Sequence, residues 1–217
     1  MVFVSSMSLD LVGTHIFPTS HRSFYGIFSY LYVMSKELEV KIKWIVAQHE
    51  STNHKYDDYL PYEFHLKMVA KNAQKFGKAV AEICWPGGDL SGKDILLAAW
   101  GHDLIEDTRV SYNDVAKALG PKVADIIYAV TNEKGKNRSE RANDKYYEGI
   151  RNTSGAVFVK LCDRIANVEY SKMTGSRMFE IYKKENDDFL VKLGFINGQA
   201  HLYGELSKHL EKILEIN

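Results

Sequence analysis

The sequence predicts an all-α fold. Apolar residues recur at helical spacing along most of the chain, as they do at Leu38, Ile42, Ile45 and Val46. No segment shows convincing strand alternation, and the four prolines stand mostly at breaks between helical patterns. With 217 residues, of which 45% are hydrophobic and 26% charged, the chain has the composition of an ordinary globular protein and can bury a large core.

Caps and breakers define the first helices. Ser35 caps a helix whose first turn is acidic, and a polar loop follows from about residue 50 to residue 61. A second amphipathic helix covers residues 62–83 and stops at Trp85-Pro86-Gly87-Gly88. A third, over residues 91–106, is apolar all round before its last turn, so we expect it to be buried.

The later helices follow from similar signals. Ser111 and Asp114 form a capping box for a short helix that ends at Gly120, and Pro121 suits the first position of the next helix. We then expect a charged loop over 132–139, a polar helix over 139–151, an apolar helix over 156–170 and amphipathic helices over 176–193 and 201–216. The main domain should span residues 34–175, with residues 176–217 packed on it and residues 1–33 as a poorly packed extension.

Composition excludes several classes of protein. Lys+Arg and Asp+Glu both number 28, so the formal net charge is zero, and no basic stripe marks a nucleic-acid partner. The chain contains no run of about 18 or more apolar residues, so the sequence predicts no membrane-spanning helix. Cys84 and Cys162 form no CxxC pair, which favours a reducing cytoplasm. The two terminal helices either pack on the core or form a homodimer contact.

Polar residues interrupt three of the apolar helices. They are His65 in the second helix, His102 and Asp103 at the end of the third, and Asp163 in the helix over 156–170. Each has an ordinary explanation on its own, because a lone histidine is often satisfied within a core and Asp163 can pair with Arg164. Together, these nitrogen and oxygen donors suit manganese, iron, cobalt or nickel, and they suit zinc less because no thiolate is present.

Charge is concentrated further in Gly-His-Asp-Leu-Ile-Glu-Asp-Thr, residues 101–108. His102 and Glu106 are four residues apart, as are Asp103 and Asp107, so each pair shares a helix face. Ionisable groups at the end of a buried helix are costly unless something compensates them. A divalent cation is the simplest compensation.

Three motifs in this order resemble the HD-domain metal-dependent phosphohydrolases. They are Pro61-Tyr62-x-x-His65, His102-Asp103-x-x-Glu106-Asp107-Thr108 and Val159-Lys160-Leu161-x-Asp163-Arg164-x-x-Asn167. The resemblance covers roughly residues 48–170 and is most specific to the hydrolase domain of the RelA/SpoT group and its small stand-alone relatives. It implies an HD-domain helical bundle with a metal site between helices.

The resemblance also implies roles for individual residues. His65, His102, Asp103 and Asp163 match the metal ligands, with Mn²⁺ the first expectation and Fe²⁺, Co²⁺ or Ni²⁺ as alternatives. Glu106 and Asp107 match the pair that positions and activates the attacking water. The implied reaction is hydrolysis of a phosphorylated nucleotide, with guanosine-3′,5′-bis(diphosphate) 3′-pyrophosphohydrolase activity as the leading subclass. The alternatives are a nucleotide phosphatase acting on deoxynucleotides or NADPH, a catalytically silent nucleotide-binding module, and a purely structural bundle without metal.

The substrate contacts depart from the family pattern. The family usually has an Arg-Lys pair nine and eight positions before the first ligand histidine, where this chain has Tyr56 and Asp57, with His54 and Lys55 alongside. Asn167 is kept, whereas Tyr170 replaces a threonine that contacts substrate. The expected substrate contacts are Lys55, Tyr56, Lys160, Asn167 and Tyr170. Lys160 either holds a phosphate or pairs with Asp107 or another acid, and the loop residues Lys134, Lys136 and Arg138 either meet phosphates or stay solvated.

Overall fold

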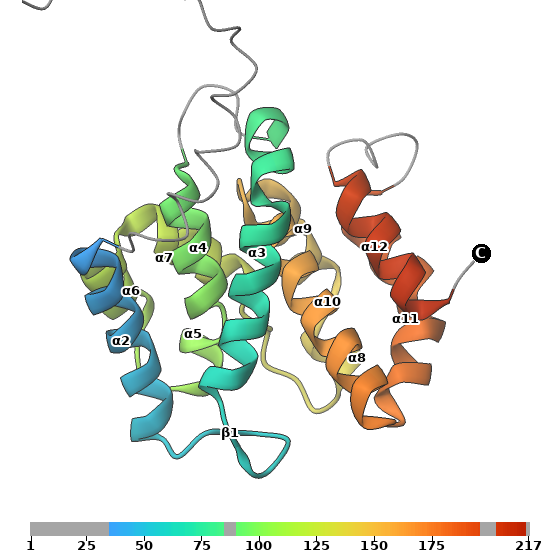
Figure 1. Cartoon of the computed structure of the whole chain (residues 1–217), viewed down its shortest axis with the longest axis horizontal. Coiled ribbons are helices and arrows are strands. Elements are labelled where there is room, and N and C mark those ends of the chain that lie inside the picture. Colours follow the sequence, from blue (N-terminus) through green and yellow to red (C-terminus); the bar gives the residue numbers. More distant parts are fainter. Residues whose placement is uncertain (1–34, 85–89, 196–202, 216–217) are drawn as a thin grey trace, which may run out of the picture. The chain divides into compact units, whose positions relative to one another are not determined.

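A computed structural model of the chain describes residues 35–84, 90–195 and 203–215. The expected extension over residues 1–33 and the breaker at 85–88 lie outside these ranges. Within them the chain is almost entirely helical, and its two long central helices are α3 (Glu63–Cys84) and α10 (Ala156–Thr174) (Figure 1). The prediction of an all-α fold is confirmed.

The first described helix leads into a short hairpin that the sequence analysis missed. Helix α2 (Lys36–Ser51) ends there, and strands β1 (Lys55–Tyr56) and β2 (Leu60–Pro61) pair antiparallel before α3 begins. The expectation of no strand is therefore wrong, because two-residue strands are too short to show alternation. Asp57 and Asp58 turn the chain between the strands with φ values of 52° and 66°, a left-handed conformation in which Asp is among the better tolerated residues.

The helix expected over residues 91–106 is divided into α4 (Gly92–Gly101) and α5 (Leu104–Asp107). Ser91 caps α4 in a reciprocal capping box with Asp94. The division falls at Asp103, whose φ of −100° and ψ of 4° leave the helical region. The expectation that His102 and Glu106 share a helix face is therefore wrong: His102 is buried, whereas Glu106 is exposed.

In the segment after α5, the first two helices begin where the sequence predicts. Helix α6 (Tyr112–Leu119) starts at the expected capping box, and Pro121 begins α7 (Pro121–Val130). The polar helix expected over 139–151 is instead two helices, α8 (Arg138–Arg141) and α9 (Asp144–Asn152). The reason is Asn143, whose side chain accepts a hydrogen bond from the backbone N–H of Tyr146 and so caps a new helix.

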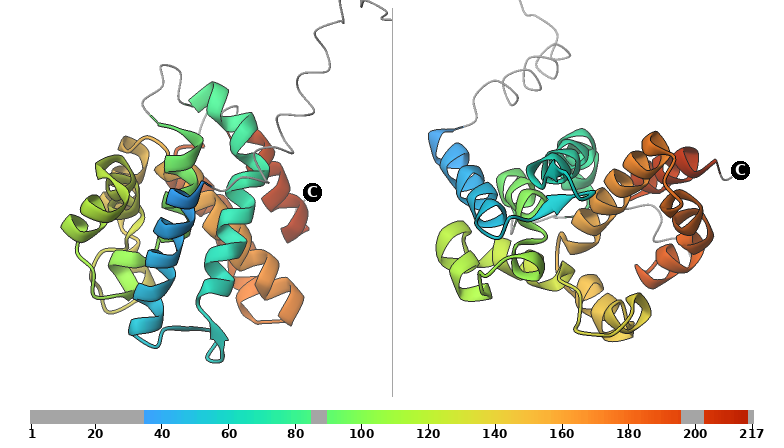
Figure 2. Two further views of the ribbon diagram at one scale, coloured as in Figure 1. Left: turned by 60° about the vertical axis from the view of Figure 1, so that its left-hand side comes forward. Right: turned by 90° about the horizontal axis from the view of Figure 1, so that it is seen from below.

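Helix α10 lies at the centre of the bundle (Figure 2). It packs against six other helices: α3, α4, α7, α9, α11 (Met178–Lys192) and α12 (Gly204–Leu214). Gly155 precedes α10 with a φ of 83°, and a Cβ there would lie only 2.7 Å from Cδ1 of Ile95. Only glycine meets both the conformation and the close approach.

The buried side chains form one core between these helices. Its largest fully buried members include Phe158, Phe189, Leu97, Ile127 and Leu161. None of the described helices is both long enough and apolar enough to cross a bilayer.

Candidate active site

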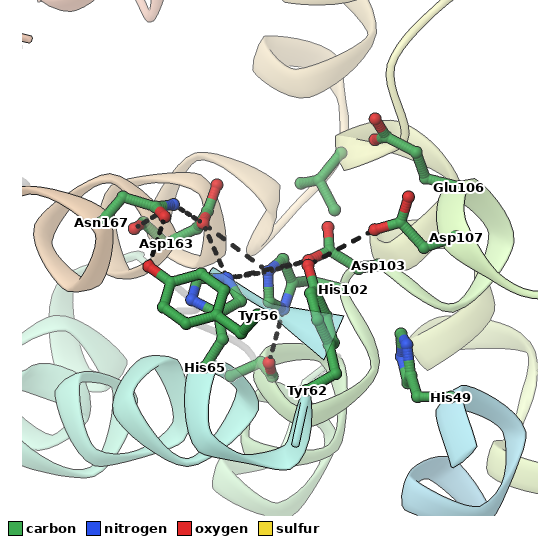
Figure 3. Close-up of polar contacts among 12 residues, drawn as sticks. His49, Tyr56, Tyr62, His65, His102, Asp103, Glu106, Asp107, Asp163 and Asn167 are labelled. Atoms are coloured by element: carbon green, nitrogen blue, oxygen red, sulfur yellow. Dashed lines mark hydrogen bonds and ion pairs between the residues drawn. The ribbon is translucent and has the colours of Figure 1, made fainter. Parts of the chain in front are cut away.

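Four polar side chains, from α3, from the turn after α4 and from α10, meet in the interior of the bundle (Figure 3). His65 comes from the first turn of α3, His102 and Asp103 from the turn between α4 and α5, and Asp163 from the middle of α10. His65 and His102 are each only 2% exposed. The break after α4 is what turns the neighbouring side chains of His102 and Asp103 towards the same cluster.

The atoms of this cluster have the spacing of a metal site. Nε2 of His65 lies 3.2 Å from Nε2 of His102 and 3.3 Å from Oδ1 of Asp163. Nε2 of His102 lies 3.0 Å from Oδ2 of Asp103. Two ligand atoms that each stand about 2.0–2.2 Å from one metal are separated by roughly 3.0–3.5 Å. The donor atoms of His65, His102 and Asp163 therefore fit a single small divalent cation, and Oδ2 of Asp103 lies beside them next to His102.

The hydrogen bonding of His102 supports the same arrangement. Its Nδ1 lies 2.9 Å from the carbonyl oxygen of Ala99, so Nδ1 carries the proton and donates. In the neutral ring, Nε2 then presents its lone pair to the cluster. A backbone carbonyl that fixes the tautomer in this way is the usual support of a metal-binding histidine.

Without a cation, the cluster holds its charges by mutual pairing. Burial alone lowers the pKa of His102, but the charge and hydrogen bond of Asp103 raise that pKa to about 10. Burial opposes ionisation of Asp163, yet the charge of Lys160 and the hydrogen bonds of His102 and His65 hold its pKa well below the usual value. The protein thus stabilises ionised carboxylates in its interior, as a cation site requires.

Lys160 contributes directly to this pairing. Its Nζ lies 3.0 Å from Oδ2 of Asp163 and 5.8 Å from the ring centre of Tyr146. Burial disfavours the charged amine, but Tyr146 and Asp163 raise its pKa well above the ordinary value. Of the alternatives for Lys160, the structure shows pairing with an acid of the cluster, Asp163, and not with Asp107.

The two acidic residues of α5 occupy different environments. Asp107 lies at the edge of the cluster, where burial, followed by the charge of Asp103, raises its pKa to about 7. Glu106 points away and accepts hydrogen bonds from the side chain and backbone of Asn132, with Nδ2 2.8 Å from its Oε1. Asp107 is therefore the carboxylate that faces the cluster.

An aromatic stack of Tyr62, His54 and His49 covers Asp103 and Asp107, and the sequence analysis missed it. The Tyr62 hydroxyl donates to Oδ2 of Asp103 and lies 3.4 Å from Oδ2 of Asp107. The ring centres of His54 and Tyr62 are stacked 3.7 Å apart, and the His49 ring is stacked against Tyr62 at 4.7 Å. Burial lowers the pKa of His49 to about 4. The sequence signal that could have identified His49 is its position four residues after Ile45, on the apolar face of α2.

Only some of the residues expected to contact the substrate lie together near the cluster. Tyr56 stacks on His65 with ring centres 4.8 Å apart, and its hydroxyl donates to Oδ1 of Asn167. Asn167 in turn donates to Oδ1 of Asp163 at 2.6 Å. Tyr170 lies near this group and donates to Asp57. Lys55 is exposed in β1, as are Lys134 and Lys136 in the loop before α8. The side chain of Arg138 lies outside the described residues.

Comparison with known proteins gives sequence relatives of one kind. Guanosine-3′,5′-bis(diphosphate) 3′-pyrophosphohydrolase MESH1 of Drosophila melanogaster is 26% identical over 127 residues, covering 58% of this chain and 65% of that protein. The Danio rerio protein of that name is 25% identical, with 58% and 64% covered, and the Mus musculus protein is 31% identical, with 41% and 50% covered. The chain thus spans less than two thirds of the length of these relatives. No family model matches it.

The fold has a solved counterpart. The structure of "a metazoan ortholog of SpoT" that "hydrolyzes ppGpp" is matched with a TM-score of 0.62 at 21% identity, covering 84% of this chain and 96% of the other. This likeness shows a shared HD-domain fold. The sequence relatives and the shared fold together relate this chain to the RelA/SpoT-type HD hydrolases.

Proposed function

We propose that this chain is a metal-dependent phosphohydrolase that removes the 3′-pyrophosphate from guanosine-3′,5′-bis(diphosphate). The observation that carries the proposal is the buried cluster of His65, His102, Asp103 and Asp163, with Asp107 at its edge. The activity for which the MESH1 relatives are named supports the choice of substrate. These four residues would hold the cation, for which Mn²⁺ is the first choice because the donors are nitrogen and oxygen.

The bound cation supplies Lewis acidity, which polarises a phosphoryl oxygen and makes water more acidic. Asp107 serves as general base, because it is the carboxylate that faces the cluster without belonging to it. Burial raises the pKa of Asp107, which favours its role as a proton acceptor. The Tyr62 hydroxyl and the His54 ring limit where this carboxylate can move.

Glu106 is proposed to position the attacking water. This role requires its carboxylate to turn from Asn132, to which it is bonded by both oxygens. Asn132→Ala therefore provides a separate test: releasing Glu106 should change the turnover number without changing metal content.

The partner of this site is a small phosphorylated nucleotide. The chain offers no basic stripe for nucleic acid, and its formal net charge is zero. We place the protein in the cytoplasm, since the described free cysteine, Cys162, is a buried thiol. A homodimer is part of the proposal, to be tested by light scattering.

The decisive experiment is a hydrolysis screen with Mn²⁺, read by chromatography of the products. The substrates are guanosine tetraphosphate, NADPH, deoxynucleoside triphosphates and nucleoside monophosphates. Pyrophosphate release from guanosine tetraphosphate is the expected result, and Asp107→Asn should lower the rate by about 10²–10⁴-fold while metal stays bound. Activity on NADPH or deoxynucleotides alone would redirect the proposal to a nucleotide phosphatase. Bound metal without any turnover would favour the silent binding module.

A further inference from the structure

A cavity of about 170 Å³ opens beside the cluster, between the β1–β2 hairpin and α10. It is below the roughly 300–1,000 Å³ of pockets that enclose a whole drug-sized ligand, so it suits one part of a nucleotide. Its lining is polar and aromatic. The lining residues are Tyr56, Asp57, Asn167, Tyr170, Ser171, Thr174, Ser176, Met178 and Tyr182.

The charge of this lining decides which part of a nucleotide it can take. None of the described residues that line the cavity is a lysine, arginine or histidine, and Asp57 is acidic. A phosphate would meet a carboxylate with no cation to offset the repulsion. Three tyrosines instead line the cavity, and aromatic side chains are typical of sites that hold a flat ring. The cavity therefore suits a base and disfavours a phosphate.

The position of Asp57 is fixed from two directions. The hairpin turn holds its backbone at a φ of 52°, and Oδ2 accepts a hydrogen bond of 2.7 Å from the Tyr170 hydroxyl on α10. This bond raises the pKa of Tyr170, so the phenol keeps its proton and remains a donor. A carboxylate has about four lone-pair sites, which leaves Asp57 able to accept two more hydrogen bonds.

The cavity adjoins the cluster through two of its lining residues. Tyr56 and Asn167 line the cavity, while Tyr56 stacks on His65 and Asn167 donates to Asp163 (Figure 3). A single nucleotide can thus place its reacting phosphate at the cluster and its base in the cavity.

We propose that Asp57, oriented by Tyr170, determines base specificity by accepting hydrogen bonds from two adjacent N–H groups of the base. The N1–H and N2–H₂ groups of guanine form such an edge, whereas adenine presents there the N1 acceptor and a C2–H that is no hydrogen-bond donor. The inference rests on the proposed function, which places the phosphates at the cluster. It assigns a selective role to a residue at which this chain departs from the family pattern.

The test compares guanosine tetraphosphate with its inosine counterpart, which lacks the 2-amino group. Loss of one hydrogen bond to a carboxylate should lower kcat/KM by roughly 10- to 100-fold in the wild-type protein. In Asp57→Asn the two substrates should differ by less than about 3-fold, because the amide offers a single acceptor oxygen. Asp58→Asn is the matched control: it shares the turn and a left-handed φ of 66° but does not line the cavity. It should keep the wild-type preference.

The outcomes separate this inference from the proposed function. Equal kcat/KM for both substrates in the wild-type protein would overturn the role of Asp57 while hydrolysis stands. If the protein hydrolyses neither substrate, binding of guanosine and inosine monophosphates is measured by ligand-observed NMR. A guanosine preference that Asp57→Asn removes would then support base recognition and overturn the proposed activity. Equal binding of the two would overturn both.

Discussion

Loading of the cluster with Mn²⁺ should stabilise the fold, and His65→Gln should abolish that effect. The donor atoms of His65, His102 and Asp163 already lie within 4.8 Å of one another, so binding requires little rearrangement. At a free Mn²⁺ concentration 100 times the dissociation constant, the gain in unfolding free energy is about 2.7 kcal/mol. For a chain of this size, each kcal/mol raises the melting temperature by about 2–4 °C. We therefore expect a rise of about 5–11 °C.

The same experiment has a defined pH dependence. The pKa of His102 is raised to about 10 by Asp103 when no cation is bound. Because a ligating histidine must be neutral, metal binding has to displace that proton. The Mn²⁺ concentration that gives half of the full melting shift should therefore fall as the pH rises from 6 to 8.

The assay is thermal unfolding followed by circular dichroism, with the protein first stripped by chelator. His209→Gln is the matched control, because it makes the same replacement on α12, where the ring pairs with Glu169 and not with the cluster. The control should retain the full shift. The reasoning is refuted if none of Mn²⁺, Fe²⁺, Co²⁺ and Ni²⁺ raises the melting temperature, or if His65→Gln responds like the wild-type protein.

Three further predictions follow from buried or constrained positions. Lys160→Met should lower the stability of the metal-free protein by about 3–5 kcal/mol, since it removes the cation that pairs with the buried Asp163, and Mn²⁺ should restore more stability to it than to the wild type. His49 has a folded pKa of about 4, below its unfolded value near 6.5, so it contributes stability above pH 6.5 that is lost as the pH falls towards 4. His49→Phe should reduce that loss by up to roughly 3 kcal/mol in denaturant titrations, and an unchanged pH slope would contradict the assignment. Gly155→Ala should destabilise by about 2 kcal/mol or more through strain and overlap with Ile95, whereas Gly204→Ala, with open space at its Cβ, should be neutral in the same titration.

The sequence predicts best where the determining contacts are local. The capping box of Ser111 and Asp114 and the start of α7 at Pro121 depend on residues within one turn of each other, and the structure has both as expected. The division between α4 and α5 also lies within a few residues. It was missed because the apolar run before it reads as one uninterrupted helix, and the cluster that stabilises the turn at Asp103 comes from α3 and α10.

The candidate site likewise contains residues that the sequence predicts and contacts that only the packing defines. Its four polar cluster residues stand out in the sequence because each interrupts an apolar helix, and the structure brings them together. The hydrogen bond from Tyr170 to Asp57 joins residues 113 positions apart, and no local sequence pattern indicates it. The partner of Lys160 could not be predicted for the same reason. The sequence offers several acids, and only the packing of the helices brings Asp163 next to its amine.

Opposite charges at the two ends of the site set the direction in which a nucleotide can lie. At one end, Asp103 and Asp163 carry negative charge and Lys160 carries positive charge, so these three residues and a bound divalent cation would together carry a net charge of +1 before the carboxylate of Asp107 at the edge is counted. At the other end, Asp57 makes the cavity acidic. A phosphate is therefore attracted to the cluster and repelled from the cavity, whatever the contacts of the base. Lys160 contributes to this asymmetry, because without it the loaded cluster would carry one positive charge less.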